Sequence, residues 1–324
     1  MKRFYLLFAV AIAVMLFFGC KKTDSAEGNP FFEATWDTPY GVPPFDRIKF
    51  EHFRPAFERG MSLQNEEIAT IVESKDEPTF ENVILAYDNS GEMLSKVSRV
   101  FSLLNSAETN EQMQALSAEL SPLQSAHRDA IILNDKLFSK VKTIYDKRGA
   151  LNLNAEQLRL TEKIYDSFVR SGALSGEEDK ARLKQINEQL SALSVKFGQN
   201  LLAETNAYTL EVTKEDLKGI PETVCDAAQE QAAKMEKGDG KYIFTLHKPS
   251  MLPLLTYAEN RSLREQIYKA YISRGNNDNE NDNKSTIADI ISLRYEKAKL
   301  LGFDTFADYV VSNQMAKSLS LIHI

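Results

Sequence analysis

Hydrophobic residues recur at spacings of three and four positions along most of this chain, which is the pattern of amphipathic helices. Three series predict long helices that pack side by side, close to antiparallel. They are Val83, Tyr87, Leu94, Val97, Phe101 and Leu104; Met113, Leu116, Leu120, Leu123, His127 and Ala130; and Leu183, Ile186, Leu190, Leu193, Phe197 and Leu201. Pro122 lies inside the second series and predicts a kink or break. Asp46 is a candidate cap for an earlier helix passing Phe53 and Phe57.

Two short segments, residues 208–212 and 241–246, depart from the helical pattern. Their β-branched and aromatic residues predict a pair of strands that flank a helix over 221–237. Helical spacing returns after Pro253 and again from Ile287 to Leu301. The pattern as a whole predicts a mainly α fold of long packed antiparallel helices with one short two-stranded β element.

The first thirty residues have the pattern of an export signal followed by a tether. Lys2 and Arg3 precede an uncharged apolar run over 4–18, which is too short to span a membrane as a helix. Gly19 and Cys20 follow it, and this order resembles a bacterial lipoprotein signal, in which Cys20 is lipidated. We therefore expect residues 1–19 to be a lipoprotein-type signal peptide and 20–30 a polar tether. A plainly secreted chain and an uncleaved anchor are the alternatives.

On the lipoprotein interpretation the protein is exported and held at a bacterial membrane by lipid on Cys20, at the periplasmic or outer-membrane face. Cys225 is then the only other thiol, so neither an intrachain disulfide nor a cysteine zinc site is expected. Cys225 lies in a helical pattern, where a buried, unreactive side chain is expected rather than a nucleophile.

Composition narrows the class of protein. With 14 glycines and 10 prolines in 324 residues, 43% hydrophobic and 26% charged, the chain is neither loop-rich nor disordered. The net charge is −7, and it becomes more negative if the basic residues of the signal are removed. An acidic chain without a basic stripe is a poor nucleic-acid binder, so no nucleic-acid partner is expected.

Histidine is scarce, with only His52, His127, His247 and His323. A His-Glu-x-x-His zinc motif needs two histidines four residues apart on one helical face, and no such pair exists. His127 lies on an apolar series and is expected to be a core histidine, whereas His52 and His247 adjoin turns and prolines and are expected to be structural. A Gly-x-Ser-x-Gly nucleophile motif is also missing. The residues alone therefore identify no catalytic and no metal-ligating side chain.

Two polar segments match ligand-binding loops only in part. Residues 238–241, Gly-Asp-Gly-Lys, lack the first glycine of a phosphate-binding loop and predict a hairpin-like turn entering a strand. Asp278, Glu280 and Asp282 alternate as in a calcium loop, but Asn283 stands where that loop requires glycine. A polar loop that caps the next helix is the favoured interpretation.

Several stretches resemble one known family in order and spacing. They are residues 43–57 (Pro-Pro-Phe-Asp-Arg-Ile-Lys-Phe-Glu-His-Phe-Arg-Pro-Ala-Phe), 78–83 (Pro-Thr-Phe-Glu-Asn-Val), 125–129 (Ser-Ala-His-Arg-Asp), 257–265 (Tyr-Ala-Glu-Asn-Arg-Ser-Leu-Arg-Glu), 293–303 (Leu-Arg-Tyr-Glu-Lys-Ala-Lys-Leu-Leu-Gly-Phe) and 315–317 (Met-Ala-Lys). Together they resemble the N-terminal half of the thimet oligopeptidase-type zinc metallopeptidases, in the branch of peptidyl-dipeptidase Dcp and oligopeptidase A. The resemblance covers about residues 30–318.

The resemblance implies a nearly all-helical protein of two halves that face a deep channel, where short unfolded peptides are cut at a zinc ion. Its peptidyl-dipeptidase branch releases C-terminal dipeptides. The family's zinc ligands and substrate-binding residues lie in the C-terminal half, so no position here inherits a catalytic, metal-binding or substrate-binding role. We expect residues 31–318 to form channel wall, to bind no zinc alone and to pack mainly against that missing half.

Residues 319–324 match nothing in the family, so they are expected to be an assembly artefact or, alternatively, the end of a natural short paralogue. On the artefact interpretation, His323 is foreign to the protein. A hypothesis of another class is a non-enzymatic helical lipoprotein that binds a solute, because the residues alone show an anchor and helices but no catalytic motif.

Overall fold

The computed structural model describes residues 28–323, and most of these residues are helical. The chain divides into two compact units, Met1–Asp76 with Leu85–Met113, and Glu77–Ile84 with Gln114–Ile324. A mainly α fold with one small antiparallel sheet is confirmed. Within the described residues, no helix combines the length and the apolar character needed to cross a membrane.

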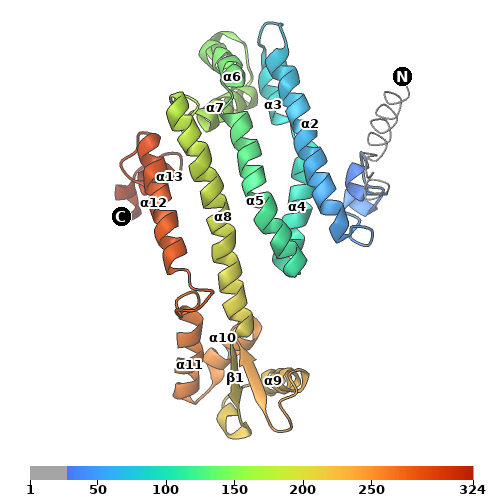
Figure 1. Ribbon diagram of the computed structural model, residues 1–324, viewed down its shortest axis with the longest axis vertical. Helices are drawn as coiled ribbons and strands as arrows, with labels where there is room; N and C mark the ends of the chain where they lie inside the picture. The colour runs from blue at the N-terminus through green and yellow to red at the C-terminus, as the bar shows by residue number, and fades with distance from the viewer. Residues whose placement is uncertain (1–27, 324) are drawn as a thin grey trace, which may run out of the picture. The chain divides into compact units, whose positions relative to one another are not determined.

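The first unit is built on two packed helices, α2 (Phe53–Glu73) and α4 (Glu92–Ala107), with the single turn α3 (Ala86–Asp88) between them in sequence (Figure 1). The helices approach closely at Gly60, where an added Cβ would lie 3.0 Å from the Leu94 Cα. Phe53 and Phe57 of α2 both pack edge-on against Phe101 of α4. Apolar area buried by these rings is what holds the pair together.

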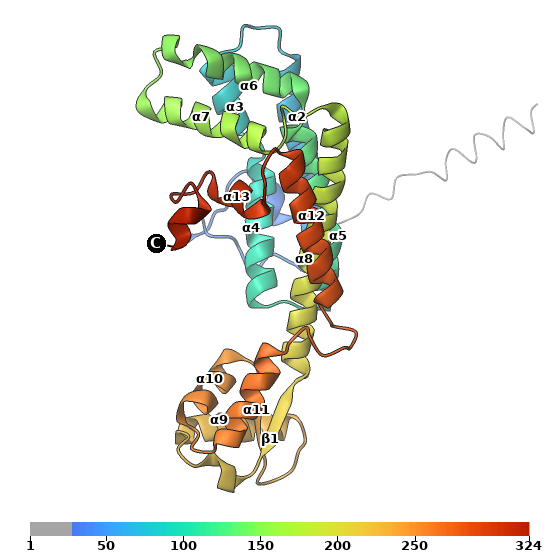
Figure 2. The ribbon, with the colours of Figure 1, turned by 90° about the vertical axis from the view of Figure 1, so that its left-hand side faces the viewer.

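The second unit contains a bundle of long helices. Its members are α5 (Glu111–Ile132), of which Gln114 onward belongs to this unit, α6 (Asp135–Lys147), α7 (Ala155–Arg170), α8 (Glu177–Ala207), α12 (Lys284–Leu300) and α13 (Phe306–Val311). Asn134 caps α6, and Asn154 forms a capping box with Gln157 at the start of α7, which explains where these two helices begin. Helix α8 packs beside α12, as Figures 1 and 2 both show.

A small α/β module continues from the C-terminal end of α8 (Figure 2). It comprises β1 (Thr209–Val212), α9 (Glu222–Lys234), β2 (Tyr242–Thr245), α10 (Lys248–Tyr257) and α11 (Arg261–Ile272). The strands pair antiparallel with Thr209 opposite Thr245, and the alternating buried positions of β1 face α9, α10 and α11 through one apolar core. The predicted strand pair around a helix is thus confirmed.

Three local predictions are wrong. Helix α5 runs without a break through Pro122 and contacts α8 on both sides of it: Ser121 bonds Ser191 before the proline, and Asp129 accepts from Asn187 after it. Helix α2 begins at Phe53 rather than at Asp46, after a 3-10 turn over Phe50–His52.

The first apolar series is also interrupted. Phe80–Leu85 is π-helical, and α4 starts only after Gly91, whose φ of 75° an L side chain rarely adopts. The Gly91 N–H donates to the Glu67 carboxylate at 2.7 Å, so the chain turns back along α2 instead of continuing one helix.

Candidate functional site

A polar cleft of about 430 Å³ lies in the second unit among α5, α8, α12, α13 and the end of α7. Its wall is made of hydroxyl, amide and charged side chains, with Leu190 as its one aliphatic side chain. The lining residues are Ser121, Gln124, Ser125, Arg128, Asp129, Ser171, Asn187, Leu190, Ser191, Ser194, Lys297 and Tyr309. Small-ligand sites are usually concave and mostly apolar with a few converging polar groups, so this cleft shares their concave form and converging groups but has a far more polar wall.

Three of these side chains form a chain of hydrogen bonds across the helices. The Asn187 Nδ2 of α8 donates to both carboxylate oxygens of Asp129 on α5, at 3.0 and 2.9 Å. The Asn187 Oδ1 accepts from the Lys297 Nζ of α12 at 2.5 Å. Asn187 therefore stands between an acid and a base, and fixes the positions of both.

Burial shifts the acid and the base in opposite directions. Asp129 is only 5% exposed, and loss of hydration raises its pKa, although the Asn187 bonds and the nearby Lys297 oppose the shift. Loss of hydration likewise lowers the pKa of Lys297, and the charge of Arg128 lowers it further while Asp129 opposes. Two cations, Arg128 and Lys297, and one anion, Asp129, thus line the cleft, and Asp129 and Lys297 have lost part of their hydration.

The Arg128 guanidinium is exposed and makes no hydrogen bond or ion pair with any other described residue. It also lines a second hollow of about 350 Å³ with Lys163, Asp166 and Arg170. Arg170 is engaged there, since its guanidinium donates to the Tyr309 carbonyl at 2.6 Å and to the Ser312 hydroxyl at 2.5 Å. Of the cations that line the first cleft, Arg128 is therefore the one that no described side chain engages; Lys163, which lines only the second hollow, is likewise exposed and without a hydrogen bond or ion pair to the described residues.

The serines of the cleft are not arranged as a catalytic dyad with histidine, because no histidine lines the cleft in the part of the chain that the structure describes. Ser121 and Ser191 bond each other at 2.5 Å, and Ser194 donates to the Leu190 carbonyl. A serine needs an adjacent base to attack a substrate, and no histidine, lysine or carboxylate among the described residues is hydrogen-bonded to the serines of the cleft.

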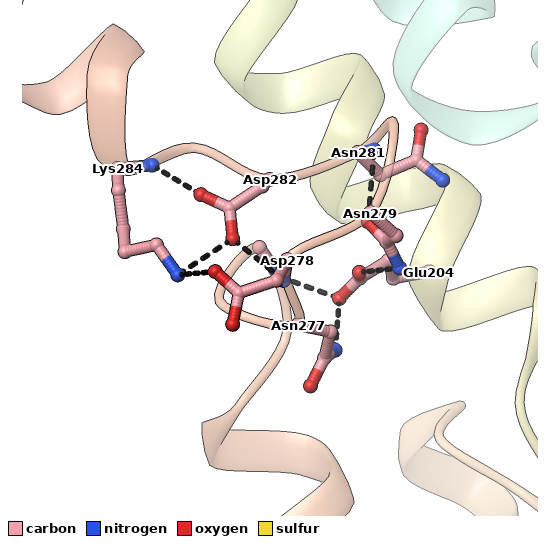
Figure 3. Close-up of polar contacts among 8 residues, drawn as sticks. Glu204, Asn277, Asp278, Asn279, Asn281, Asp282 and Lys284 are labelled. Atoms are coloured by element: carbon pink, nitrogen blue, oxygen red, sulfur yellow. Dashed lines mark hydrogen bonds and ion pairs between the residues drawn. The ribbon is translucent and has the colours of Figure 1, made fainter.

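A second polar cluster joins the end of α8 to the loop before α12 (Figure 3). The Glu204 carboxylate, only 7% exposed, accepts from the Gly275 N–H at 2.6 Å and from the side-chain amides of Asn277 and Asn279 at 2.8 Å each. Four groups of the cluster therefore satisfy one another, and Glu204 fastens the loop to the helix. No motif or spacing in the sequence indicated this role of Glu204.

The calcium-like residues lie in the same loop, and they are engaged by the protein itself. Asp278 and Asp282 both pair with the Lys284 ammonium, at 2.5 and 3.0 Å, while Glu280 is exposed (Figure 3). Asp282 also accepts from the Lys284 N–H at 2.8 Å, at the first residue of α12. The predicted capping loop is confirmed, and it is the lysine that balances the acidic charge.

The histidines occupy separate structural positions. His52 accepts from the Lys49 N–H in the turn before α2, and His247 bonds Thr245 and Asn206 where β2 leads into α10. His127 is half-buried on α5, where loss of hydration lowers its pKa. His127 is thus less buried than a core histidine would be, and the structural roles expected for these three side chains stay predictions. The side chain of His323 is outside what the structure describes.

The remaining candidates are also structural. Cys225 is half-buried on α9, and burial together with Asp226 raises the pKa of its thiol, which disfavours the reactive thiolate. Residues 238–241 form the predicted turn into β2, with Gly238 and Gly240 at φ values of 81° and 74°. Cys20 and the predicted signal peptide lie outside the described residues.

The side chains of the described residues do not form a zinc site. Over residues 28–323, no three His, Cys, Asp or Glu side chains are placed to hold a metal ion together. No catalytic step is therefore assigned to a metal held by these residues. The expectation that the chain alone binds no zinc stays a prediction.

Comparison with known proteins identifies relatives along nearly the whole chain. The family model described as "Peptidase family M3" matches residues 254–320. A dipeptidyl carboxypeptidase of Escherichia coli is 36% identical over 292 residues, which are 90% of this chain and 42% of that protein. An oligopeptidase A of Haemophilus influenzae is 33% identical over 86% of this chain and 41% of its own length. The chain thus spans about two fifths of the length of these relatives.

Proposed function

Because this chain belongs to the thimet oligopeptidase-type peptidases of family M3, in the branch of dipeptidyl carboxypeptidase and oligopeptidase A, we propose that it serves the hydrolysis of short peptides. The 36% identity to a dipeptidyl carboxypeptidase over 90% of the chain carries this proposal. It favours a peptidase over the non-enzymatic solute-binding lipoprotein. Release of C-terminal dipeptides is the specific reaction that we propose.

We further propose that the described residues form the wall of the peptide channel and do not hold the catalytic zinc. Peptidases of this family depend on zinc, yet residues 28–323 contain no cluster that fits it. The relatives have more than half of their length outside the matched region. Zinc ligands, the general base and the main packing partner of this wall are assigned to such a segment.

A chimera tests the role directly. The matched region of the Escherichia coli dipeptidyl carboxypeptidase is replaced by residues 31–318, and zinc content and dipeptide release from an N-blocked peptide are measured. We expect a zinc-loaded active chimera, whereas this chain alone should hold far less than one zinc and give no turnover. A folded, zinc-loaded but inactive chimera would count against the wall role, and so would stoichiometric zinc or turnover by the chain alone.

For its location, we propose export and lipidation at Cys20, supported by the apolar run over 4–18 that ends in Gly19-Cys20. Cells producing the chain are labelled with palmitate, and the labelled protein is recovered from membranes. The label should disappear in Cys20→Ser and persist in Cys225→Ser, which is the matched control because Cys225 is the other cysteine of the chain. Label that persists in Cys20→Ser would refute the anchor.

A further inference from the structure

We propose that the cleft among α5, α8 and α12 binds a small oxyanion, a carboxylate or a phosphate group, between Arg128 and Lys297. The site is independent of zinc and of peptide hydrolysis. Only one of its two possible ligand sources, the free carboxylate of a short peptide, rests on the function proposed above.

The charges in the cleft favour an anion. Asp129 is the one acidic lining residue, and the Asn187 amide already donates to both of its oxygens. Arg128 and Lys297 are two cations against that single carboxylate, in a chain whose overall charge is −7. A positive spot inside an acidic protein is not a by-product of composition, so it requires its own explanation.

The two cations of the cleft carry like charges and repel each other. Arg128 and Lys297 line the same cleft, and the charge of Arg128 contributes to the lowered pKa of Lys297 after the larger effect of burial. The Lys297 ammonium donates one hydrogen bond to Asn187, and the Arg128 guanidinium donates none to the described residues. An anion between them would relieve the repulsion and accept charge-assisted hydrogen bonds from both.

Serine hydroxyls provide neutral donors around the same space. Ser125, one turn before Arg128 on α5, is half-buried and makes no hydrogen bond with other described residues. In the Ser121–Ser191 pair only one hydrogen lies between the two oxygens, so the second hydroxyl retains a hydrogen that can turn toward a ligand. A volume of about 430 Å³ admits ligands up to the size of a dipeptide.

Binding to the purified chain is measured by isothermal titration with three probes: N-acetyl-dialanine, its C-terminal amide, and inorganic phosphate. We expect saturable binding of at least one of the two anions, and none of the amide. Tighter binding of the peptide identifies a peptide carboxylate as the ligand, and tighter binding of phosphate identifies a phosphate group. Either result supports the oxyanion site. If neither anion binds at concentrations up to about 10 mM, the proposal is overturned.

Variants locate the binding. Arg128→Gln should lower the affinity for the anion by about tenfold or more, because it removes one charge-assisted hydrogen bond. Arg128→Lys should restore part of the affinity. Arg99→Gln is the matched control, since Arg99 is an exposed arginine of α4 in the other unit and its loss changes the net charge equally. Equal binding by Arg128→Gln and the unmodified chain would overturn the proposal.

A second readout does not depend on affinity. Bound anion should raise the pKa of Lys297, because it adds negative charge beside a lysine that is now shifted downward. The lysine signal is followed by NMR with and without the tighter anion. A Lys297 titration that is unchanged under saturating anion would place the ligand elsewhere and refute the site.

Discussion

Removal of the Glu204 carboxylate should loosen the connection between α8 and the loop 273–283. In Glu204→Ala three donors lose their acceptor: the Gly275 N–H and the side-chain amides of Asn277 and Asn279. The two asparagine residues are exposed, so their amides can turn to water at little cost. Gly275 is buried, and its N–H has no such alternative.

The expected loss follows from this difference. A hydrogen bond to a charged group contributes about 1.5–3 kcal/mol, and an unsatisfied buried donor costs about 1–3 kcal/mol. With one buried donor and two that rehydrate, the free energy of unfolding should fall by about 2–4 kcal/mol in Glu204→Ala. Glu204→Gln keeps one acceptor oxygen without the charge, so a loss of about 1–2 kcal/mol is expected.

Two assays measure the effect. Urea unfolding gives the free energy, and amide hydrogen exchange over residues 273–284 should accelerate by about 30-fold or more, the equivalent of 2 kcal/mol. Glu280→Gln is the matched control, because Glu280 is an exposed carboxylate of the same loop with no bond to the described residues. The reasoning is refuted if Glu204→Ala and Glu280→Gln unfold with the same free energy and exchange equally.

Three other predictions concern the second unit. Gly219→Ala should destabilise the α/β module by about 2–4 kcal/mol in urea unfolding, because φ is +86° and the new Cβ would lie 2.4 Å from the Tyr257 carbonyl oxygen. A loss below 1 kcal/mol would contradict the close approach. The Arg182 guanidinium lowers the pKa of Glu296, so their pair stabilises the protein above the ordinary glutamate pKa of about 4.3 and is lost as the pH falls through the lowered value. In Arg182→Gln the NMR titration midpoint of Glu296 should rise toward the ordinary glutamate value, and an unchanged midpoint would refute the pairing. Because both side chains are more than a third exposed, the free energy of unfolding should change by less than about 1 kcal/mol. Finally, Ile291 is 60% exposed on α12 beside exposed Ile287 and Tyr295, so we expect the chain to self-associate in sedimentation experiments and Ile291→Ser to reduce that association; a chain that stays monomeric, or association unchanged in Ile291→Ser, would contradict this.

The periodicity of the chain predicted most of the long helices and both strands, but it predicted neither the helices α6, α7 and α13 nor the ends of the elements. Leu183 and Ile186 are fully buried on α8 as the third series predicts, because a repeated spacing needs only local geometry. Leu123 of the second series is 48% exposed, since the same spacing cannot tell which neighbour covers each turn. The break at Gly91 depends on a contact to Glu67, 24 residues earlier, and a distant contact of that kind has no local signal.

The cleft was out of reach of sequence reasoning for the same reason. Motif searches recognise ligands that one helix or loop presents together, such as two histidines four residues apart. Asp129, Asn187 and Lys297 come from three helices and are 58 and 110 residues apart in sequence, so only packing of α5, α8 and α12 brings them together. Their burial shifts the pKa of the acid and of the base, and no composition or spacing contains that information.

Two of the stretches that carry the family resemblance nevertheless supply this cleft. Residues 125–129 contribute Ser125, Arg128 and Asp129, and residues 293–303 contribute Lys297. Neither stretch contains a zinc motif, and helix packing requires neither an arginine nor a half-buried lysine at these positions. Asp129 and Lys297 lose hydration in the fold. They do not regain that free energy from an ion pair with each other, because each is hydrogen-bonded to Asn187, which lies between them. A bound oxyanion would balance the charge of Arg128 and Lys297 and would account for charged residues at these positions. The binding experiments therefore test a role for residues 125–129 and 293–303 that zinc catalysis does not provide.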